Sequence, residues 1–151
     1  MTNPRMPENV PDFVTEHLQR YLDSNGEDGH EWSSAGMGDH GDCPALLLTT
    51  IGRRSGQPII TPLIYGEAGG AYVVIASKGG APTHPHWYLN LDANPEVDVQ
   101  IRTERFKARA RTAAGAERAE LWDLMLIIYP TYTELQGRTA REIPVVVLEK
   151  E

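Results

Sequence analysis

The sequence predicts a small α+β or mainly β protein, built on a barrel of about six mostly antiparallel strands with two or three helices. Short runs of branched apolar residues, such as 45–51 and 71–76, recur along the chain and are separated by glycine-rich turns. Only a few segments show the apolar spacing of helices. With 151 residues, the chain is long enough for one domain with a sizeable core.

The same patterns place each element along the chain. Apolar residues recur every three or four positions in three expected helices: 12–22, 84–94 and 116–129. Six segments have the patterning of strands: 45–51, 57–65, 71–76, 97–101, 106–111 and 143–148. Pro58 and Pro62 put the second strand at an edge or at a break in the pairing, because proline cannot donate a ladder hydrogen bond.

Charge divides the chain into two parts. Residues 1–42 hold nine acidic and two basic residues, whereas residues 43–151 hold twelve of each sign, and the total is -7. We predict an acidic N-terminal helix and flexible loop over 1–42, with 24–42 as a mobile flap, followed by a barrel domain over 43–151. A neutral body argues against nucleic acid as a partner, since binding to phosphates needs a dominant basic face.

Cysteine count and hydropathy restrict the location. Cys43 is the single cysteine, so an internal disulfide is excluded, and we interpret it as a small buried residue. No signal-peptide pattern is present, and no apolar run approaches the roughly 18 residues of a membrane span. We therefore expect a cytoplasmic protein without integral membrane contact, a location that still allows peripheral contact. The sequence does not distinguish a monomer from a dimer.

Two basic turns are the main candidates for a binding site. The segments 52–56 (GRRSG) and 77–80 (SKGG) each follow an expected strand, and glycine lets a ligand approach the main chain. Together they predict one site for a ligand with several negative charges, although a solvated basic hairpin is the alternative reading of the first turn. His84 and His86 have no carboxylate or cysteine beside them to complete a metal shell, so no metal is expected.

Aromatic and basic side chains near these turns have two readings. Trp87 and Tyr88 follow the second turn, while Tyr129 and Tyr132 bracket a proline, and they serve either as core or as stacking partners for a flat ligand. A basic ladder on one face of the expected 106–111 strand is read as a solvent-facing surface in preference to an anion groove. Its members are Arg105, Lys107, Arg109 and Arg111.

Four motifs in this order resemble the deazaflavin-dependent nitroreductase family, over roughly residues 44–149. The motifs are 52–58 (GRRSGQP), 76–80 (ASKGG), 87–91 (WYLNL) with 93–95 (ANP), and 129–132 (YPTY). The resemblance implies a split β-barrel, similar to FMN-binding split barrels, that binds coenzyme F420, an 8-hydroxy-5-deazaflavin with a phosphate and an oligoglutamate tail. It implies hydride transfer from the reduced coenzyme to a quinone, such as menaquinone, or to a nitro compound.

The resemblance also implies roles for residues within the motifs. Side chains implied to hold the phosphate and carboxylates of the tail are Arg53, Arg54, Ser55 and Lys78, which agrees with the bidentate binding of anions by guanidinium groups. Residues implied to line the deazaflavin ring are Pro62, Leu63, Ile64, Ala76, Ser77, His86, Trp87, Tyr88 and Asn90. Residues implied to orient the acceptor or to pass a proton are Tyr132, Ser77 and Tyr129.

Two positions depart from the family members that reduce nitroimidazoles. Leu135 stands three positions after Tyr132, and Ile64 stands beside Tyr65, where those members carry tyrosines. A pocket without these hydroxyls has fewer donors to orient a polar acceptor. A flavin (FMN) oxidoreductase of the same barrel type and a non-catalytic deazaflavin carrier are the alternative functions.

Overall fold

The computed structural model describes residues 12–25, 31–32 and 43–151. The helices within this part are α1 (Asp12–Asp23), α2 (His86–Ala93), α3 (Gly115–Ile128) and α4 (Tyr132–Gly137), with a 3-10 turn, η2 (Lys78–Gly80). The strands are β1 (Glu31–Trp32), β2 (Cys43–Ile51), β3 (Pro58–Ala68), β4 (Ala71–Ile75), β5 (Glu96–Ile101), β6 (Glu104–Thr112) and β7 (Val145–Lys150). The expected flap falls largely on 26–30 and 33–42, which lie outside the described residues.

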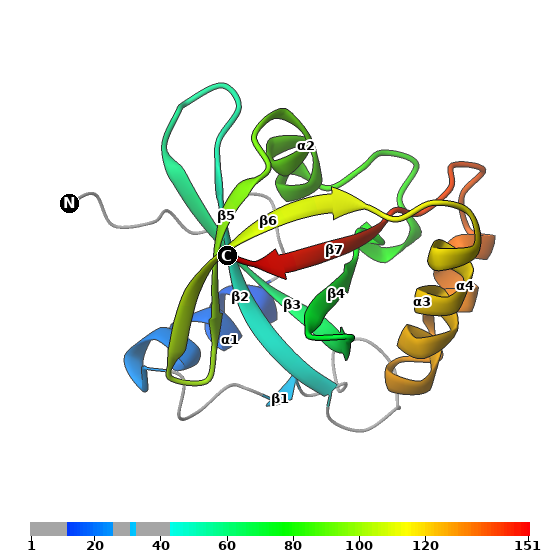
Figure 1. Ribbon diagram of the computed structural model, residues 1–151. Coiled ribbons are helices and arrows are strands. Elements are labelled where there is room, and N and C mark those ends of the chain that lie inside the picture. Colours follow the sequence, from blue (N-terminus) through cyan, green and yellow to red (C-terminus); the bar gives the residue numbers. More distant parts are fainter. Residues whose placement is uncertain (1–11, 26–30, 33–42) are drawn as a thin grey trace.

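Six of the strands close into an antiparallel barrel (Figure 1). The order is β2-β3-β4-β7-β6-β5, and β5 returns to pair with β2, with Leu48 opposite Val99. Each strand of the ring therefore pairs with two neighbours over at least part of its length, and β1 adds only a short pairing to the start of β2. The predicted barrel of about six antiparallel strands is confirmed.

The position of Pro62 follows from how β3 divides its pairing. The first part of β3, as far as Ile64, pairs with β2, whereas the stretch from Tyr65 to Ala68 pairs with β4. Pro62 lies opposite Leu47 in the first part, where β4 does not pair with the strand. The N–H that Pro62 lacks would face the side without a partner strand, so no ladder hydrogen bond is lost. This agrees with the prediction that Pro62 marks a break in the pairing.

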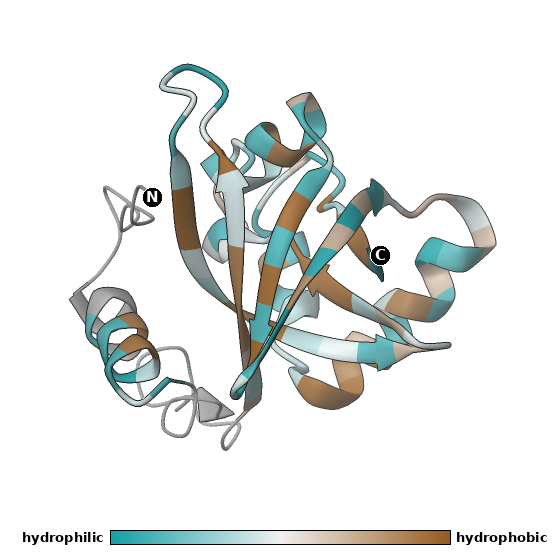
Figure 2. Cartoon of the chain, turned by 60° about the vertical axis from the view of Figure 1, so that its left-hand side comes forward, coloured by the Kyte–Doolittle hydropathy of each residue, from teal (hydrophilic) through white to brown (hydrophobic). Residues whose placement is uncertain are grey.

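Side chains of the barrel wall alternate between two apolar clusters, because successive residues of a strand face opposite ways. Figure 2 shows hydrophobic bands along the strands of the barrel. The barrel-interior cluster contains Leu46, Leu48, Val74, Val97, Val99, Ala108, Val146 and Leu148, together with Trp87 from α2. The helix-side cluster contains Ala45, Ile64, Val73, Ile75, Val145 and Val147, covered by Leu121, Met125, Tyr129, Tyr132 and Leu135 of the α3–α4 region. The fold is thus a filled barrel with α3 and α4 packed on one side (Figure 1).

Helix α1 is fastened to the barrel by two fully buried residues. Leu18 and Tyr21 pack with Leu47 and Ile60. The Tyr21 hydroxyl accepts a hydrogen bond from the Arg102 N–H at 2.7 Å. In Figure 1, α1 lies near one end of the barrel and α2 near the other. The first basic turn, between β2 and β3, lies beside α2.

Some element boundaries differ from the sequence-based ones. Helix α4 was expected only as a turn, and that prediction is wrong; four helices are present in the described residues instead of two or three. The expected strand 143–148 begins two residues later, at Val145, because Ile143 and Pro144 enter the core before the ladder to β4 starts. Cys43 is buried, as predicted.

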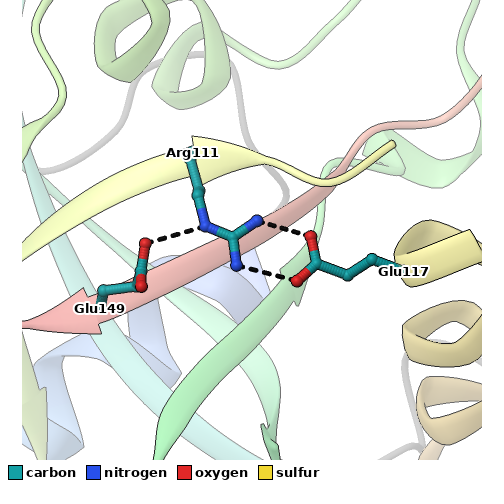
Figure 3. A network of polar contacts seen from close by, with 3 residues as sticks. All are labelled: Arg111, Glu117 and Glu149. Carbon is teal, nitrogen blue, oxygen red and sulfur yellow. Dashed lines mark hydrogen bonds and ion pairs between the residues drawn. The ribbon is translucent and has the colours of Figure 1, made fainter. Parts of the chain in front are cut away.

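The basic ladder of β6 is a solvent-exposed surface that binds carboxylates of the same chain. Arg111 donates from Nη2 to Glu117 Oε2 and from Nε to Glu149 Oε1, each at 2.8 Å (Figure 3). Arg109 contacts Glu96, and Arg105 donates to Asn25 Oδ1. These contacts confirm the predicted solvent-facing surface.

The Arg111 network gives a prediction for the pH dependence of stability. The hydrogen bond from Arg111 lowers the pKa of the Glu117 carboxyl below its ordinary value of 4.5. The ion pair therefore stabilises the fold above that value, and the stabilisation is lost as the pH falls through the lowered pKa. We expect Glu117→Gln to lower the melting temperature slightly at pH 7 and by less at pH 3, measured by thermal unfolding. An equal loss at both values would show that charge is not the cause.

Candidate functional site

The first basic turn, between β2 and β3, uses much of its own backbone internally. The Gly52 N–H donates to Gln57 O, the Gly56 N–H donates to Gly52 O, and the Gln57 N–H donates to Ser55 Oγ. The Arg53 N–H donates to Asn90 Oδ1 of α2 at 3.1 Å. Because these donors are occupied, binding of an anion here depends mainly on side chains.

The two arginines of this turn have different surroundings. The Arg53 guanidinium donates to Asn90 Oδ1 at 2.9 Å, and its Nη2 lies 3.4 Å from His86 Nδ1. The Asn90 amide in turn donates to Thr50 Oγ1, which fixes this set against β2. Arg54 is exposed and makes no side-chain hydrogen bond or ion pair with the described part of the chain. Arg54 is therefore the cation of this turn best placed to receive a ligand from solvent.

The second basic turn is a left-handed loop that ends against α4. The φ angles of Lys78, Gly79 and Gly80 are 46°, 63° and 80°, a region that favours glycine. The Gly80 N–H donates to Ser77 O, which tightens the turn and occupies one donor of the predicted anion nest. The exposed Lys78 ammonium donates to Thr83 Oγ1 at 3.1 Å, so its charge stays at the surface.

Helix α2 connects the two turns. Its side chains His86 and Asn90 contact Arg53 of the first turn, and residues 81–85 join the second turn to its first residue. Just before the helix, His84 packs against Tyr88 with ring centroids 4.9 Å apart. The β2–β3 turn and α2 also lie side by side in Figure 1. The first basic turn thus contacts α2 directly, whereas the second packs against α4 and reaches α2 through the chain.

Arg141 is a site residue that the sequence reasoning missed. Its guanidinium donates to three carbonyl oxygens of the second turn and its flanks, those of Ala76, Ser77 and Ala81, and Nη1 lies 3.0 Å from His84 Nδ1. The contacts join residues about sixty positions apart, so no local sequence pattern predicts them. These contacts therefore hold the loop that carries Lys78 against the segment between α4 and β7.

The aromatic residues divide between the two clusters. Trp87 is 7% exposed and belongs to the barrel-interior cluster, so core packing is its main role here. Tyr88 is half-buried and its hydroxyl lies 3.0 Å from Thr112 Oγ1. Tyr129 and Tyr132 meet edge to face at 4.9 Å in the helix-side cluster. Of the four, Tyr88 has the most exposed ring position for stacking on a ligand.

Burial controls the protonation of the two tyrosines near α4. Tyr132 is 4% exposed, and loss of solvent raises the pKa of its hydroxyl far above the ordinary value. Burial also raises the pKa of Tyr129. Both hydroxyls therefore keep their protons at neutral pH. Either can donate a hydrogen bond, and neither can act as a base.

The strand residues expected around a ring lie on different faces. Leu63 is half-buried beside the barrel-interior cluster, and Ile64 belongs to the helix-side cluster. Pro62 and Ala76 are buried, while Ser77 is half-buried. Ile64 shares its cluster with Tyr132 and therefore lies with the aromatic pair, away from the interior of the barrel.

These donors fit an elongated anionic ligand better than a compact one. Exposed cations come from two separate turns, at Arg54 and Lys78, and Arg53 is exposed beside α2. A guanidinium group binds phosphate or carboxylate through paired donors, and an ammonium group binds them as a point charge. A ligand with several anionic groups along a chain would use both turns.

The fold and these donors define a split-barrel protein for an anionic, ring-bearing coenzyme, and comparison with known proteins makes the class specific. The model of the F420H2-dependent quinone reductase family matches residues 13–150, and the chain belongs to that family. A protein of Mycobacterium tuberculosis named F420H2-dependent quinone reductase is 40% identical over 137 residues, which cover 89% of this chain and 87% of the relative.

Solved structures agree with this assignment. The structure of an F420H2-dependent reductase, FDR-A, is 44% identical, has a TM-score of 0.66, and matches 70% of this chain and 94% of its own. A second structure, described as a domain-swapped dimer, is 40% identical with a TM-score of 0.68, over 91% of this chain and 98% of its own. A haem storage protein of Vibrio cholerae shares the fold alone, at 17% identity and a TM-score of 0.55.

The family assignment confirms three predictions from the sequence. The chain is an oxidoreductase, its coenzyme is F420, and its fold is the split barrel. The resemblance drawn from the four motifs therefore identified the correct group of proteins. Among the helices of the described residues, none combines the length and the apolar character needed to cross a bilayer.

Proposed function

We propose that coenzyme F420 binds at the α2 end of the barrel and that an apolar quinone accepts the hydride beside Tyr132. In this arrangement Arg53, Arg54, Ser55 and Lys78 hold the anionic tail. The proposal follows from the two basic turns that α2 connects, since one extended polyanion can contact both. Residues 43–151 would supply this coenzyme-binding unit, with 1–42 as an accessory segment.

The coenzyme ring would lie against the residues between the two turns. Its lining would come from Pro62, Leu63, Ile64, Ala76, Ser77, His86, Trp87, Tyr88 and Asn90. The exposed His86 and the half-buried Ser77 and Tyr88 are the members with polar groups near the surface. Reduced F420 supplies the hydride when it is bound, and the protein supplies binding, orientation and exclusion of water.

The observation that favours a quinone is the apolar character of the residues around Tyr132. Ile64 and Leu135 are 8% and 7% exposed and belong to the same cluster as Tyr132 and Tyr129. The resemblance to the nitroreductase family implies tyrosines at the positions of Ile64 and Leu135 in the members that reduce nitroimidazoles. Without those hydroxyls, the surroundings of Tyr132 are apolar and hold few donors for a nitro group. We therefore propose a menaquinone-like acceptor.

Tyr132 would orient the acceptor in this scheme. Its raised pKa keeps the hydroxyl protonated, so the hydroxyl can donate a hydrogen bond to a quinone oxygen and stabilise negative charge that develops there. Ser77 offers a second hydroxyl, near the basic turn. Tyr129 contacts the Tyr132 ring edge to face and would hold that ring in place.

Replacement of Tyr132 by phenylalanine should separate orientation from coenzyme binding. We expect Tyr132→Phe to lower kcat with menaquinone by roughly tenfold, the effect of one lost hydrogen bond of about 1.4 kcal/mol to the transition state. Coenzyme affinity should be almost unchanged, because the residue lies outside the basic turns. Stopped-flow oxidation of F420H2 and fluorescence titration measure the two quantities.

Tyr129→Phe is the matched control, since it also removes a buried hydroxyl from the same aromatic pair. We expect a smaller loss of kcat from this variant. An unchanged rate in Tyr132→Phe would remove Tyr132 from the reaction. A parallel loss of coenzyme affinity would mean that the residue acts through the fold.

Two measurements test the proposal as a whole. Titration with F420 and with FMN compares the coenzymes, and an oxidation assay then follows F420H2 with menaquinone and with a nitroimidazole. We expect tight binding of F420 and faster turnover with menaquinone. Tighter binding of FMN would favour the flavin alternative, and binding of F420 without steady turnover would favour a carrier.

We propose a cytoplasmic location with peripheral contact at the membrane, where an apolar quinone is available. The observation in its favour is the half-buried apolar set of α3 that includes Trp122 and Leu124, near the exposed Ile127. Cosedimentation with vesicles containing menaquinone tests this contact. The solved relative described as a domain-swapped dimer makes a dimer the first oligomeric state to test by light scattering.

A further inference from the structure

Arg141 lies behind the second basic turn, on the segment between α4 and β7. Its Nη2 donates to Ser77 O at 2.8 Å, its Nε donates to Ala81 O at 2.8 Å, and its Nη1 donates to Ala76 O at 3.3 Å. The three carbonyl groups flank Lys78 on both sides along the chain. The guanidinium group therefore points toward the carbonyl groups of the loop and not toward solvent.

The fork of the guanidinium group accounts for this set of contacts. Five N–H donors at fixed angles can bind several carbonyl oxygens at once, which a single ammonium group cannot do with the same geometry. The loop needs such support, since it runs through three consecutive residues with positive φ, one of which, Lys78, has a side chain. A left-handed lysine persists only where the surroundings hold it.

His84 completes the shell of Arg141. Its Nδ1 lies 3.0 Å from Arg141 Nη1, and its ring packs on Tyr88. Because arginine only donates, Nδ1 must be the unprotonated nitrogen of this ring. Asp92, on α2, is the acidic group that acts on His84, while Tyr88 faces it as a neutral ring. Burial, and then the charge of Arg141, lower the pKa of His84 from its ordinary value.

We propose that Arg141 is a positioning residue that holds the loop of Ser77 and Lys78 in its coenzyme-binding conformation, and that protonation of His84 opposes this support. The inference rests on the proposed function, since it assumes that Lys78 contacts the coenzyme tail. A protonated His84 places two cations 3.0 Å apart and removes the acceptor on Nδ1. Coenzyme affinity should therefore fall as the pH drops below the ordinary histidine range.

Variants of Arg141 test the positioning role. We expect Arg141→Gln to weaken F420 binding about tenfold and Arg141→Lys to restore little of it, because charge without the fork does not reach three carbonyl groups. Arg138→Gln is the matched control. It removes the same charge from an exposed neighbour whose hydrogen bond to the loop is long, at 3.5 Å to Gly79 O, and which makes no hydrogen bond to the carbonyl groups that Arg141 holds. Equal losses in Arg138→Gln and Arg141→Gln would assign the effect to charge and overturn the proposal.

Hydrogen exchange gives a readout without any coenzyme. We expect faster exchange of the amides of 76–84 in Arg141→Gln, with the barrel strands β2 and β5 unchanged. Faster exchange throughout the chain would mean that Arg141 only stabilises the fold, and this would overturn the positioning role. Unchanged exchange in 76–84 would do the same.

The pH arm tests His84. Affinity of the wild-type protein for F420 should fall severalfold at pH values below 6.5, the ordinary pKa of histidine, and His84→Asn, which keeps an acceptor near Arg141, should flatten this profile. The profile should also be flat in Arg141→Gln, since the pair is already broken. A slope that persists in His84→Asn would assign the titration to another group. If instead the Arg54→Ala and Lys78→Ala double variant binds F420 normally, the proposed coenzyme site itself is wrong, whatever Arg141 does.

Discussion

Replacing Arg54 and Lys78 together by alanine is expected to weaken F420 binding by roughly 30- to 100-fold at low salt, from about 1 to 1.4 kcal/mol for each exposed charge-assisted contact. The two residues come from separate turns that α2 connects, and both are exposed. Salt screens exposed charges, so the loss should shrink severalfold in 1 M salt. Fluorescence titration across a salt series measures both effects.

The basic ladder of β6 offers a control with the same change in charge. Arg105 and Lys107 are exposed cations on this strand, and neither belongs to the basic turns. We expect their double alanine variant to bind F420 with nearly the wild-type affinity. A loss in the control that matches the Arg54 and Lys78 variant would mean that overall charge attracts the coenzyme, without a specific site. Unchanged affinity of the Arg54 and Lys78 variant at every salt concentration would contradict the assignment of the tail site.

The barrel could be predicted because its signals are local. Alternation of apolar and polar residues marks strands such as β5 and β6, and the same alternation decides which side chains enter the barrel interior. Glycine-rich turns separate the strands at short intervals. Even Pro62 was informative, because a missing donor is tolerated only where a strand is paired on one side.

Helix α4 could not be predicted by the same reasoning. It has six residues and begins two positions after Pro130, so it is too short to show a repeating apolar face. Tertiary packing, with Tyr132 and Leu135 buried against the barrel wall, provides the stability that its length does not. The expectation of a simple turn therefore failed at the element that carries the proposed acceptor residue.

The candidate site was predictable in composition and less so in arrangement. The basic turns can be recognised in the sequence from their glycine and basic residues. The sequence does not show, however, that Arg53 and not Arg54 contacts Asn90. Arg141 stands in a polar stretch with no pattern, and its partners lie across the fold. Long-range contacts of this kind depend on the closed topology, which local propensity does not encode.

Gly80→Ala is expected to destabilise the protein by roughly 3 kcal/mol, from two causes that add. The backbone φ of Gly80 is 80°, which an L side chain adopts only with strain. A Cβ at this position would also lie 2.7 Å from the Leu135 backbone oxygen and 2.9 Å from Arg138 Cβ. Because that oxygen belongs to α4, either the loop or the helix must shift. Chemical denaturation measures the loss.

Gly79→Ala separates the two causes, because Gly79 has a φ of 63° and a Cβ added there would meet no atom within 4 Å. It should lose only roughly 1 kcal/mol, the cost of the left-handed backbone. The loop and α4 carry the proposed tail and acceptor residues, so Gly80→Ala should lower coenzyme affinity and kcat together, whereas Gly79→Ala should leave kcat nearly unchanged. Equal losses of stability in the two variants would show that the loop or α4 can shift to accept the Cβ without an energetic cost. The conformation of the loop that carries Lys78 would then not depend on the position of α4.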